Sequence, residues 1–349
     1  MCRTLPSGLF PSNSGARLQS KLSRPSHSNA ARVFSESLAT SDHAEAAKFL
    51  SQQGWLGTPW FRHINRPDAQ HIDTAAFHTA VALHLSLPVS AFAGLTCNCG
   101  FALSAASGPL HIQSCRQYGK NERSETFGDA FDSVLYDLGS GVWIEGARPR
   151  SGTGVRRQCA AYASVPVENS AGQPVLDTST GQQKFSDVIP DRVAGGICDS
   201  TVSVSGRYVV DYVLTAPECV SYSRRAATEK LYAAGVAHAK KLKTYTDVLR
   251  TGDVLLSVSV EIHGGVHASL RAKIQEWARL TSDGSPADAS RVLRILQQRL
   301  SMALMRARVG YVQGSLRKLR GVVARSGSAG YALSHPVTVA HYLGHRGGR

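Results

Sequence analysis

One stretch of the chain decides its fold class: Tyr208-Val209-Val210-Asp211-Tyr212-Val213-Leu214-Thr215. Its β-branched and aromatic residues are typical of a strand that packs in a sheet. Asp211 lies in the middle of this run, where a carboxylate lowers strand propensity unless it has a role. We therefore expect a strand over 207–214 and treat Asp211 as a candidate site residue.

Further strands and helices surround this run on both sides. Other strand patterns occur at 142–145, 188–189, 201–204 and 254–262. Helix patterns occur at 121–138, 225–249, 267–280 and 287–320. This order predicts an α/β domain over 121–285, with a small sheet of few strands flanked by helices. The Gly-, Ser- and Arg-rich stretch 147–183 is interpreted as an insertion or loop within it.

The part of the chain before this domain is predicted to be helical over 41–94. Ser41-Asp42 is an N-cap signal for a first helix, and Asp73 or Thr74 is the signal for a second helix that ends before Pro88. The basic, Ser-rich residues 1–40 and the tail 323–349 are expected to be disordered. The composition of 1–35 also fits an organellar transit peptide, although a nuclear location is favoured.

The formal net charge of +14 is concentrated in two terminal segments. Residues 1–35 contain five Lys or Arg and residues 289–349 contain eleven, and neither segment contains an acidic residue. Such segments suit a polyanion, either nucleic acid or an anionic surface. A merely solvated basic face is the alternative.

A basic amphipathic helix is expected over 286–322. An apolar stripe at helical spacing runs from Leu293 to Tyr311. The cations outside the stripe are candidate nucleic-acid contacts: Arg291, Arg294, Arg308, Arg317 and Lys318.

Several classes of protein are excluded or disfavoured by composition. No apolar run approaches the roughly 18 residues that a membrane span needs. The hydrophobic content of 42% is too high for a wholly disordered chain. Seven cysteines without an N-terminal apolar signal segment favour a reducing compartment, and no motif indicates a small-molecule substrate.

A compact group of metal-binding residue types occurs in 95–120. Cys97, Cys99, His111 and Cys115 offer three thiolates and one imidazole within nineteen residues, as a closed tetrahedral zinc site requires. Gly100 allows the chain to turn back after the second thiol, and His111 and Cys115 have the i, i+4 spacing of one helix face. The alternative is three buried cysteines and an unrelated histidine.

Carboxylates and lysines form a second candidate site. Asp187, Asp191 and Asp211 lie in or beside strand patterns, and Lys241 follows on a helix, with Lys240 and Lys243 as alternatives. Two carboxylates can hold Mg²⁺, which polarises a phosphate, while a lysine orients water or neutralises charge on the phosphate. Alternatively, Asp211 is a half-exposed strand residue and the lysines form a solvated helix face. Glu261, late in the last strand, is a further candidate.

The order of these motifs resembles a known family. It comprises Cys97-x-Cys99-Gly100…His111-x₃-Cys115, Lys184-x-x-Asp187-Val188, Asp211 followed by Thr215-Ala216-Pro217, Ala239-x-Lys241-x₃-Tyr245 and Val258-x-Val260-Glu261-x-x-Gly264. Over about 53–320 the chain resembles the C-terminal region of reverse transcriptases of non-LTR (LINE-type) retrotransposons. There, a zinc knuckle precedes a restriction-endonuclease-like domain of the PD-(D/E)XK class.

The resemblance implies a Mg²⁺-dependent endonuclease that nicks DNA, with element RNA as another partner. Asp187 matches the first metal-binding aspartate, although Asp191 in Pro190-Asp191 competes for this role. Asp211 matches the second metal ligand, and Lys241 matches the helix-borne lysine. The chain departs from the family at Arg123-Ser124, where Arg-His is usual, and in lacking the aromatic-x-Asp-Asp box of a reverse transcriptase. A catalytically inactive, zinc-containing nucleic-acid-binding or relic protein is therefore the alternative.

Overall fold

The structure is a computed structural model that describes residues 29–62, 73–115, 117, 121–138, 141–147, 159–169, 173–197, 199, 201–202, 206–282 and 285–326. Most of the two segments expected to be disordered, 1–40 and 323–349, lies outside these residues. Most of the candidate transit peptide, 1–35, also lies outside them. Residues 29–40 and 323–326 are described and are helical, so the expectation of disorder is wrong for them.

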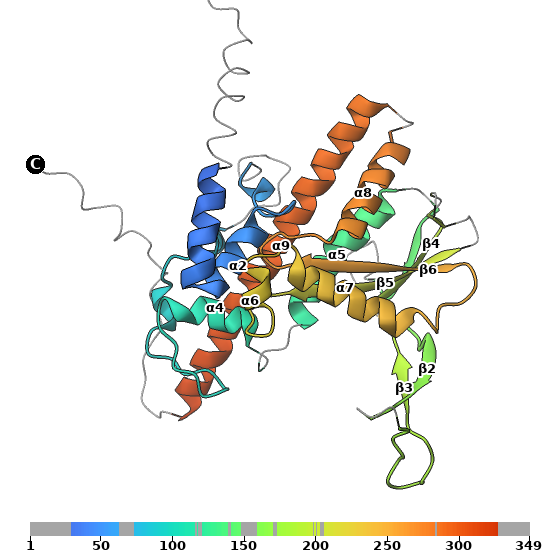
Figure 1. The fold of residues 1–349 in the computed structure, drawn as a ribbon, viewed down its shortest axis with the longest axis horizontal. Coiled ribbons are helices and arrows are strands. Elements are labelled where there is room, and N and C mark those ends of the chain that lie inside the picture. Colours follow the sequence, from blue (N-terminus) through green and yellow to red (C-terminus); the bar gives the residue numbers. More distant parts are fainter. Residues whose placement is uncertain are drawn as a thin grey trace, which may run out of the picture.

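A four-stranded mixed sheet forms the centre of the α/β part (Figure 1). Its strands follow the order β1-β4-β5-β6 and comprise β1 (Trp143–Glu145), β4 (Arg192–Gly195), β5 (Arg207–Thr215) and β6 (Asp253–Glu261). The pairs β1·β4 and β4·β5 are antiparallel, whereas β5·β6 is parallel and needs a crossover connection. The predicted α/β class with a small mixed sheet is confirmed.

The crossover is made by two helices, not by the single helix expected over 225–249. A short α6 (Ser223–Ala226) is separated from α7 (Tyr232–Tyr245) by a turn in which Leu231 has φ 63°. This left-handed conformation is uncommon for a residue other than Gly, Asn or Asp. The break therefore lacks the glycine or proline that would have indicated it in the sequence.

Helices cover both faces of the sheet. On one side, α5 (Asn121–Tyr136), α8 (Ala268–Leu280) and α9 (Pro286–Ser326) pack against alternate residues of β5, including Tyr208 and Tyr212. On the other side lies α7. Because strand side chains alternate between faces, Asp211 points toward α7 and away from the main core.

The stretch 147–183, expected to be an insertion or loop, forms part of an antiparallel arm that extends just beyond it. Strands β2 (Ala163–Pro166) and β3 (Phe185–Val188) pair with each other and project from the body (Figure 1). Tyr162 anchors the arm, since its hydroxyl donates to Asp253 at 2.6 Å.

Two strand expectations differ from the structure. A strand was expected at 201–204, but neither of its two described residues, 201 and 202, is in a strand. Strand β4 was not expected.

The preceding segment is helical, as expected. It contains α2 (His43–Gln52), η1 (Pro59–Arg62), α3 (Thr74–His84) and η2 (Ser90–Phe92), and the candidate metal-binding segment 95–120 that follows contains α4 (Ser107–Ser114). Asp42 and Asp73 are the N-caps of α2 and α3, because their carboxylates accept backbone N–H groups of the first turn. None of the described helices combines the length and apolar character required to cross a bilayer.

Candidate functional site

Two aspartates face each other on the neighbouring strands β4 and β5, where Asp191 directly precedes β4. Arg192 of β4 pairs with Val210 of β5, so the next residue pair in the antiparallel register is Asp191 and Asp211. Residues opposite each other in this way have Cβ atoms about 4.5–5.5 Å apart. The backbone N–H of Tyr212 donates to Asp191 Oδ2 at 2.7 Å, which fixes the first carboxylate beside the second. We call Asp191 and Asp211 the carboxylate pair.

Helix α7 supplies the cation and hydroxyl that contact this pair. Lys241 Nζ lies 2.7 Å from Asp211 Oδ2, and the Tyr245 hydroxyl donates to the same oxygen at 3.1 Å. The helix can approach the sheet closely because its buried face consists largely of Ala233, Ala234 and Ala237. Small side chains thus bring Lys241 and Tyr245, one turn apart, onto Asp211.

The environment of the pair is partly closed. The side chain of Asp211 is 7% exposed and that of Lys241 is 29% exposed, so the site reaches solvent on the Lys241 side. Asp191 as a residue is exposed, but protein atoms crowd its carboxyl group. This desolvation, together with the nearby Asp211, raises the pKa of Asp191 to about 6. Burial and the adjacent Asp211 also raise the pKa of Tyr245, which keeps its hydroxyl a donor.

Asp187 is separated from this site. It lies on β3 opposite Ser164 of β2, and the Ser164 hydroxyl donates to it. Among the described residues, no hydrogen bond or ion pair joins Asp187 to the carboxylate pair or to Lys241. Of the two aspartates left open by the sequence, only Asp191 therefore lies beside Asp211, because Asp187 is on β3, which belongs to the arm and not to the central sheet.

Glu261 also has a different place from the one considered. Its side chain is buried, and its Oε1 accepts the backbone N–H of Ala234 at 3.4 Å in the first turn of α7. Burial raises the pKa of Glu261. Glu261 therefore contributes to the N-terminal end of the helix that carries Lys241, and it does not contact the carboxylate pair.

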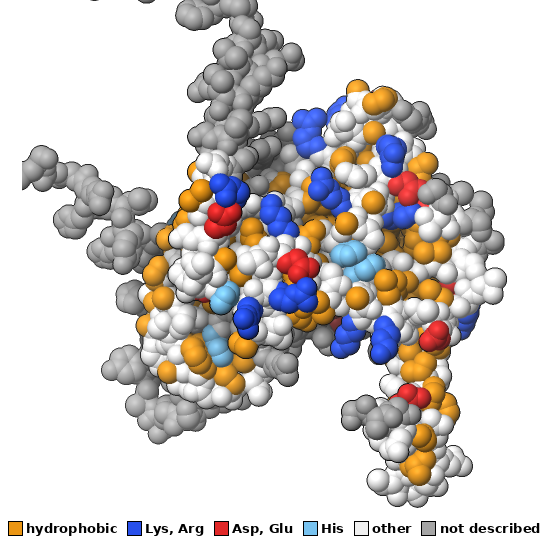
Figure 2. All heavy atoms as spheres, in the orientation of Figure 1, with side chains coloured by type: hydrophobic (Ala, Val, Ile, Leu, Met, Phe, Trp, Pro, Cys, Tyr) orange, Lys and Arg blue, Asp and Glu red, His pale blue; other side chains and the backbone are white. Residues whose placement is uncertain are grey.

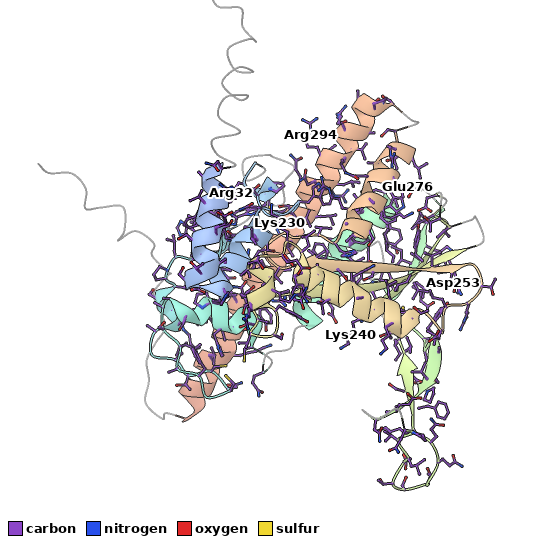
Figure 3. All side chains as sticks on the ribbon, in the orientation of Figure 1. Arg32, Lys230, Lys240, Asp253, Glu276 and Arg294 are labelled. Carbon is purple, nitrogen blue, oxygen red and sulfur yellow. The ribbon has the colours of Figure 1, made fainter. Side chains whose placement is uncertain are left out.

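Basic side chains lie on the face of α6 and α7 (Figure 2). Lys240 and Lys243 are exposed on α7, and Lys230 is exposed just before it; Lys230 and Lys240 are labelled in Figure 3. Within the described part of the chain, none of these three lysines forms an ion pair. They are therefore free to contact an anionic partner along α7, where Lys240 and Lys243 are close in sequence to Lys241.

A second site is formed by Cys97, Cys99, His111 and Cys115, which we call the Cys₃His cluster. Their ligand atoms all lie within 4.8 Å of one another and could hold a metal ion. The Sγ atoms of Cys97 and Cys115 are 3.6 Å apart, and Cys99 Sγ is 3.3 Å from His111 Nε2. The structure thus brings all four predicted ligands together.

Local backbone structure explains this convergence. Gly100 has φ 88°, and its N–H donates to Cys97 O at 2.8 Å, so the two thiols lie on one tight turn. His111 lies in α4, and Cys115 directly follows this helix, with its N–H bonded to His111 O. Burial raises the pKa of Cys115 to about 11, whereas the N–H of Phe101 contributes most to lowering the pKa of Cys99. Partial burial lowers the pKa of His111, which favours the neutral imidazole that a metal needs.

The basic helix differs from expectation at one residue. Arg291, Arg294, Arg317 and Lys318 are exposed on α9. Arg308 is buried instead, and its Nε donates to Gln113 Oε1 of α4 at 3.2 Å. Burial lowers the pKa of Arg308 to about 10. Arg308 therefore ties α9 to α4 and is not a surface contact for phosphate.

Tyr245 is a site residue to which the sequence reasoning assigned no role. Its i, i+4 spacing from Lys241 places both on one helix face, and this spacing was the available signal. The part played by the Tyr212 N–H depends on the β4–β5 register and has no signal in the sequence.

Comparisons with known proteins do not add to these observations. No known protein family matches the chain, and neither a curated protein nor a solved structure matches it.

Proposed function

We propose that this protein is a metal-dependent DNA endonuclease of the restriction-endonuclease-like class, derived from a non-LTR retrotransposon. The observation that carries the proposal is the convergence of Asp191, Asp211 and Lys241 between the sheet and α7. These groups come from three separate parts of the chain. If Asp211 were only a solvated strand residue and Lys241 only part of a solvated helix face, nothing would require them to meet.

The carboxylate pair fits a divalent cation. Hard oxygen donors on adjacent strands suit Mg²⁺, which is held by one or two carboxylates and keeps several waters. The raised pKa of Asp191 reflects crowding and repulsion between like charges, which a cation would offset. When bound there, Mg²⁺ would polarise a phosphodiester and lower the pKa of a coordinated water.

The protein's own groups have distinct roles in this proposal. Asp191 and Asp211 would hold the cation through their carboxylate oxygens. Lys241, part-exposed on α7, donates to a phosphate oxygen and stabilises the charge that develops during hydrolysis. Tyr245 keeps Asp211 in position through its hydroxyl. The exposed Lys240 and Lys243 contact the DNA backbone on either side.

The remaining architecture supports the same proposal. The resemblance implies a small mixed sheet flanked by helices. Here α5 precedes three antiparallel strands (β1, β4 and β5), and α6 and α7 then cross over to the parallel strand β6. The Cys₃His cluster has the donor set and spread of a structural zinc site, with no position left open for a substrate. Zinc there would stabilise the segment that precedes the nuclease sheet.

A catalytically inactive nucleic-acid-binding protein is the second candidate. It is favoured by the ion pair between Lys241 Nζ and Asp211 Oδ2, at 2.7 Å, which balances the charge of this carboxylate without a metal ion. In this case the pair would be structural, and the basic surfaces would still bind nucleic acid.

Plasmid nicking separates the two candidates. The full-length protein, loaded with zinc, is incubated with supercoiled plasmid and Mg²⁺ or Mn²⁺, and the open-circular product is measured over time. We expect nicking by the wild type and a loss of about 100-fold or more in Asp211→Ala and Lys241→Met.

Asp187→Asn is the matched control, since it removes an exposed carboxylate four residues from Asp191. It should nick at the wild-type rate. Absence of nicking by folded wild type, or equal rates in wild type and Asp211→Ala, would reject the nuclease and favour the binding protein.

A further inference from the structure

An exposed aromatic ring lies directly on the Cys₃His cluster. The Phe101 side chain stacks on the His111 ring, with centroids 4.3 Å apart and planes 6° from parallel. Phe101 nevertheless remains 46% exposed. Because His111 covers one face of the phenyl ring, this exposure belongs to the opposite face and the edges.

The ring is held rigidly in this exposed position. The carbonyl of Phe101 accepts the N–H of Cys97 at 2.9 Å, and the Gly100 turn precedes it. His111 is fixed in turn by α4 and by the contact of its Nε2 with Cys99 Sγ. A flat apolar surface that is already ordered loses little conformational entropy when a partner stacks on it.

The charge around this ring favours a polyanion. Residues 74–121, which include the whole cluster, contain no acidic residue, and neither do residues 289–349. Leu316 and Leu319 of α9 pack into the same hydrophobic cluster as Cys97 and Leu103. The exposed Arg317 lies between these two leucines in the sequence.

We infer that Phe101, backed by His111, is a stacking platform for an unpaired base of single-stranded nucleic acid. Every base has a π-face that can stack on an aromatic side chain, and residues 74–121 contain no acidic side chain that would repel the adjoining phosphates. A base-paired duplex cannot offer a free base face without unpairing. The platform extends the proposed function by giving the protein a single-stranded ligand, but it does not require the carboxylate pair to be catalytic.

Oligonucleotide binding by the full-length, zinc-loaded protein tests this inference. The probes are fluorescein-labelled oligothymidylate and oligouridylate of about 12 nucleotides and a duplex of the same length, followed by anisotropy. Phe101→Ala should weaken single-strand binding by about 5- to 150-fold, as expected when one base no longer stacks, and leave duplex binding unchanged. The thymidylate and uridylate arms show whether DNA or RNA is preferred.

A fluorescence experiment observes the stacking directly. In Phe101→Trp, a saturating single strand should quench the added indole fluorescence relative to wild type, because the base stacks on it. Phe185→Trp, at an exposed phenylalanine of the arm, is the matched control and should not respond. Zinc content is measured for each variant to establish that the cluster is intact.

Three outcomes would overturn the platform: equal single-strand affinity of wild type and Phe101→Ala, equal losses for single strand and duplex, or no quenching in Phe101→Trp. The outcome is independent of nicking, since Asp211→Ala should abolish nicking and keep wild-type single-strand affinity.

Discussion

At the scale of single residues, Asp211 combines burial with an unbalanced charge. A carboxylate that is 7% exposed in a strand is costly unless it is paired, and Lys241 and Tyr245 provide the pairing. Asp191 lies opposite and adds a second negative charge without a second lysine. Two carboxylates with one ammonium leave a net negative site, which is the electrostatic basis for expecting a cation there.

Asp191→Asn should therefore stabilise the protein at pH 8 in the absence of added Mg²⁺. The native-state pKa of about 6 lies above the value of about 3.9 in an unfolded chain, so the native state binds this proton more tightly. In the wild type, this group adds stability as pH falls from above 6 toward 4. A shift of two units corresponds to about 2.7 kcal/mol, which solvent screening at an exposed residue reduces to about 1 kcal/mol. Urea unfolding at pH 8 and pH 5 measures the gain, which should shrink at the lower pH.

Asp187→Asn provides the comparison for this prediction. Asp187 is exposed and is bonded to Ser164, with no second aspartate opposite it. Its substitution should give no pH-dependent gain in the free energy of unfolding. A difference between Asp191→Asn and wild type that stays constant from pH 8 to pH 5 would contradict repulsion within the carboxylate pair.

The sequence predicted Asp211 and Lys241 but could not choose between Asp187 and Asp191. The choice depends on where the arm strand β3 ends and the sheet strand β4 begins, and these two four-residue strands lie only three residues apart. Arg308 shows the same limit, since helical periodicity placed it among the surface cations. Its burial follows from the packing of α4 against α9, which sequence spacing alone does not reveal.

At the scale of elements, the long periodic segments were predictable and the short ones were not. Helices α5, α8 and α9 and strands β5 and β6 have strong apolar patterns, and the structure has them close to the expected residues. Strand β4 is four residues long and contains Gly195, so its pattern is weak. The four metal-ligand candidates were predictable because their spacing is local and depends only on one turn and one helix.

Chelation of the Cys₃His cluster should loosen two elements together. Cys97 and Cys115 are buried in the hydrophobic cluster that contains Val312 and Leu316 of α9. Because structural zinc contributes folding free energy directly, its removal should increase hydrogen exchange in 95–115 and in 309–319. Exchange in β6 should change little, since that strand belongs to a different hydrophobic cluster.

Two cysteine variants test the same coupling without a chelator. Cys115→Ser removes a ligand and should reproduce the increased exchange, whereas Cys219→Ser alters a half-buried thiol outside the Cys₃His cluster and should not. Unchanged exchange in 95–115, once metal analysis has shown that the protein is zinc-free, would contradict a structural metal site.

At the scale of the whole molecule, α9 joins the two hydrophobic clusters. This 41-residue helix contributes Leu296, Leu300 and Leu304 to the sheet core, and Met305 and Val312 to the cluster beneath the metal-binding segment. The predicted apolar stripe is thus the contact that holds both parts together. The exposed cations of α9 lie toward its two ends, while Arg308 in between is covered.

This arrangement predicts different effects for charge removal on α7 and inside the molecule. The double variant Lys240→Ala/Lys243→Ala removes two exposed cations beside the carboxylate pair. If DNA crosses that face, the slope of log affinity against log salt should become shallower by about 0.9 for each phosphate that the protein no longer neutralises, and nicking should fall with binding.

The control is Arg308→Gln, which should leave the slope unchanged and lower the free energy of unfolding instead, because it removes a buried donor to Gln113. Anisotropy of labelled duplex DNA between 50 and 200 mM salt measures both slopes. A slope that is insensitive to the α7 lysines would place DNA away from the carboxylate pair, and Lys241 could not then act on its phosphates.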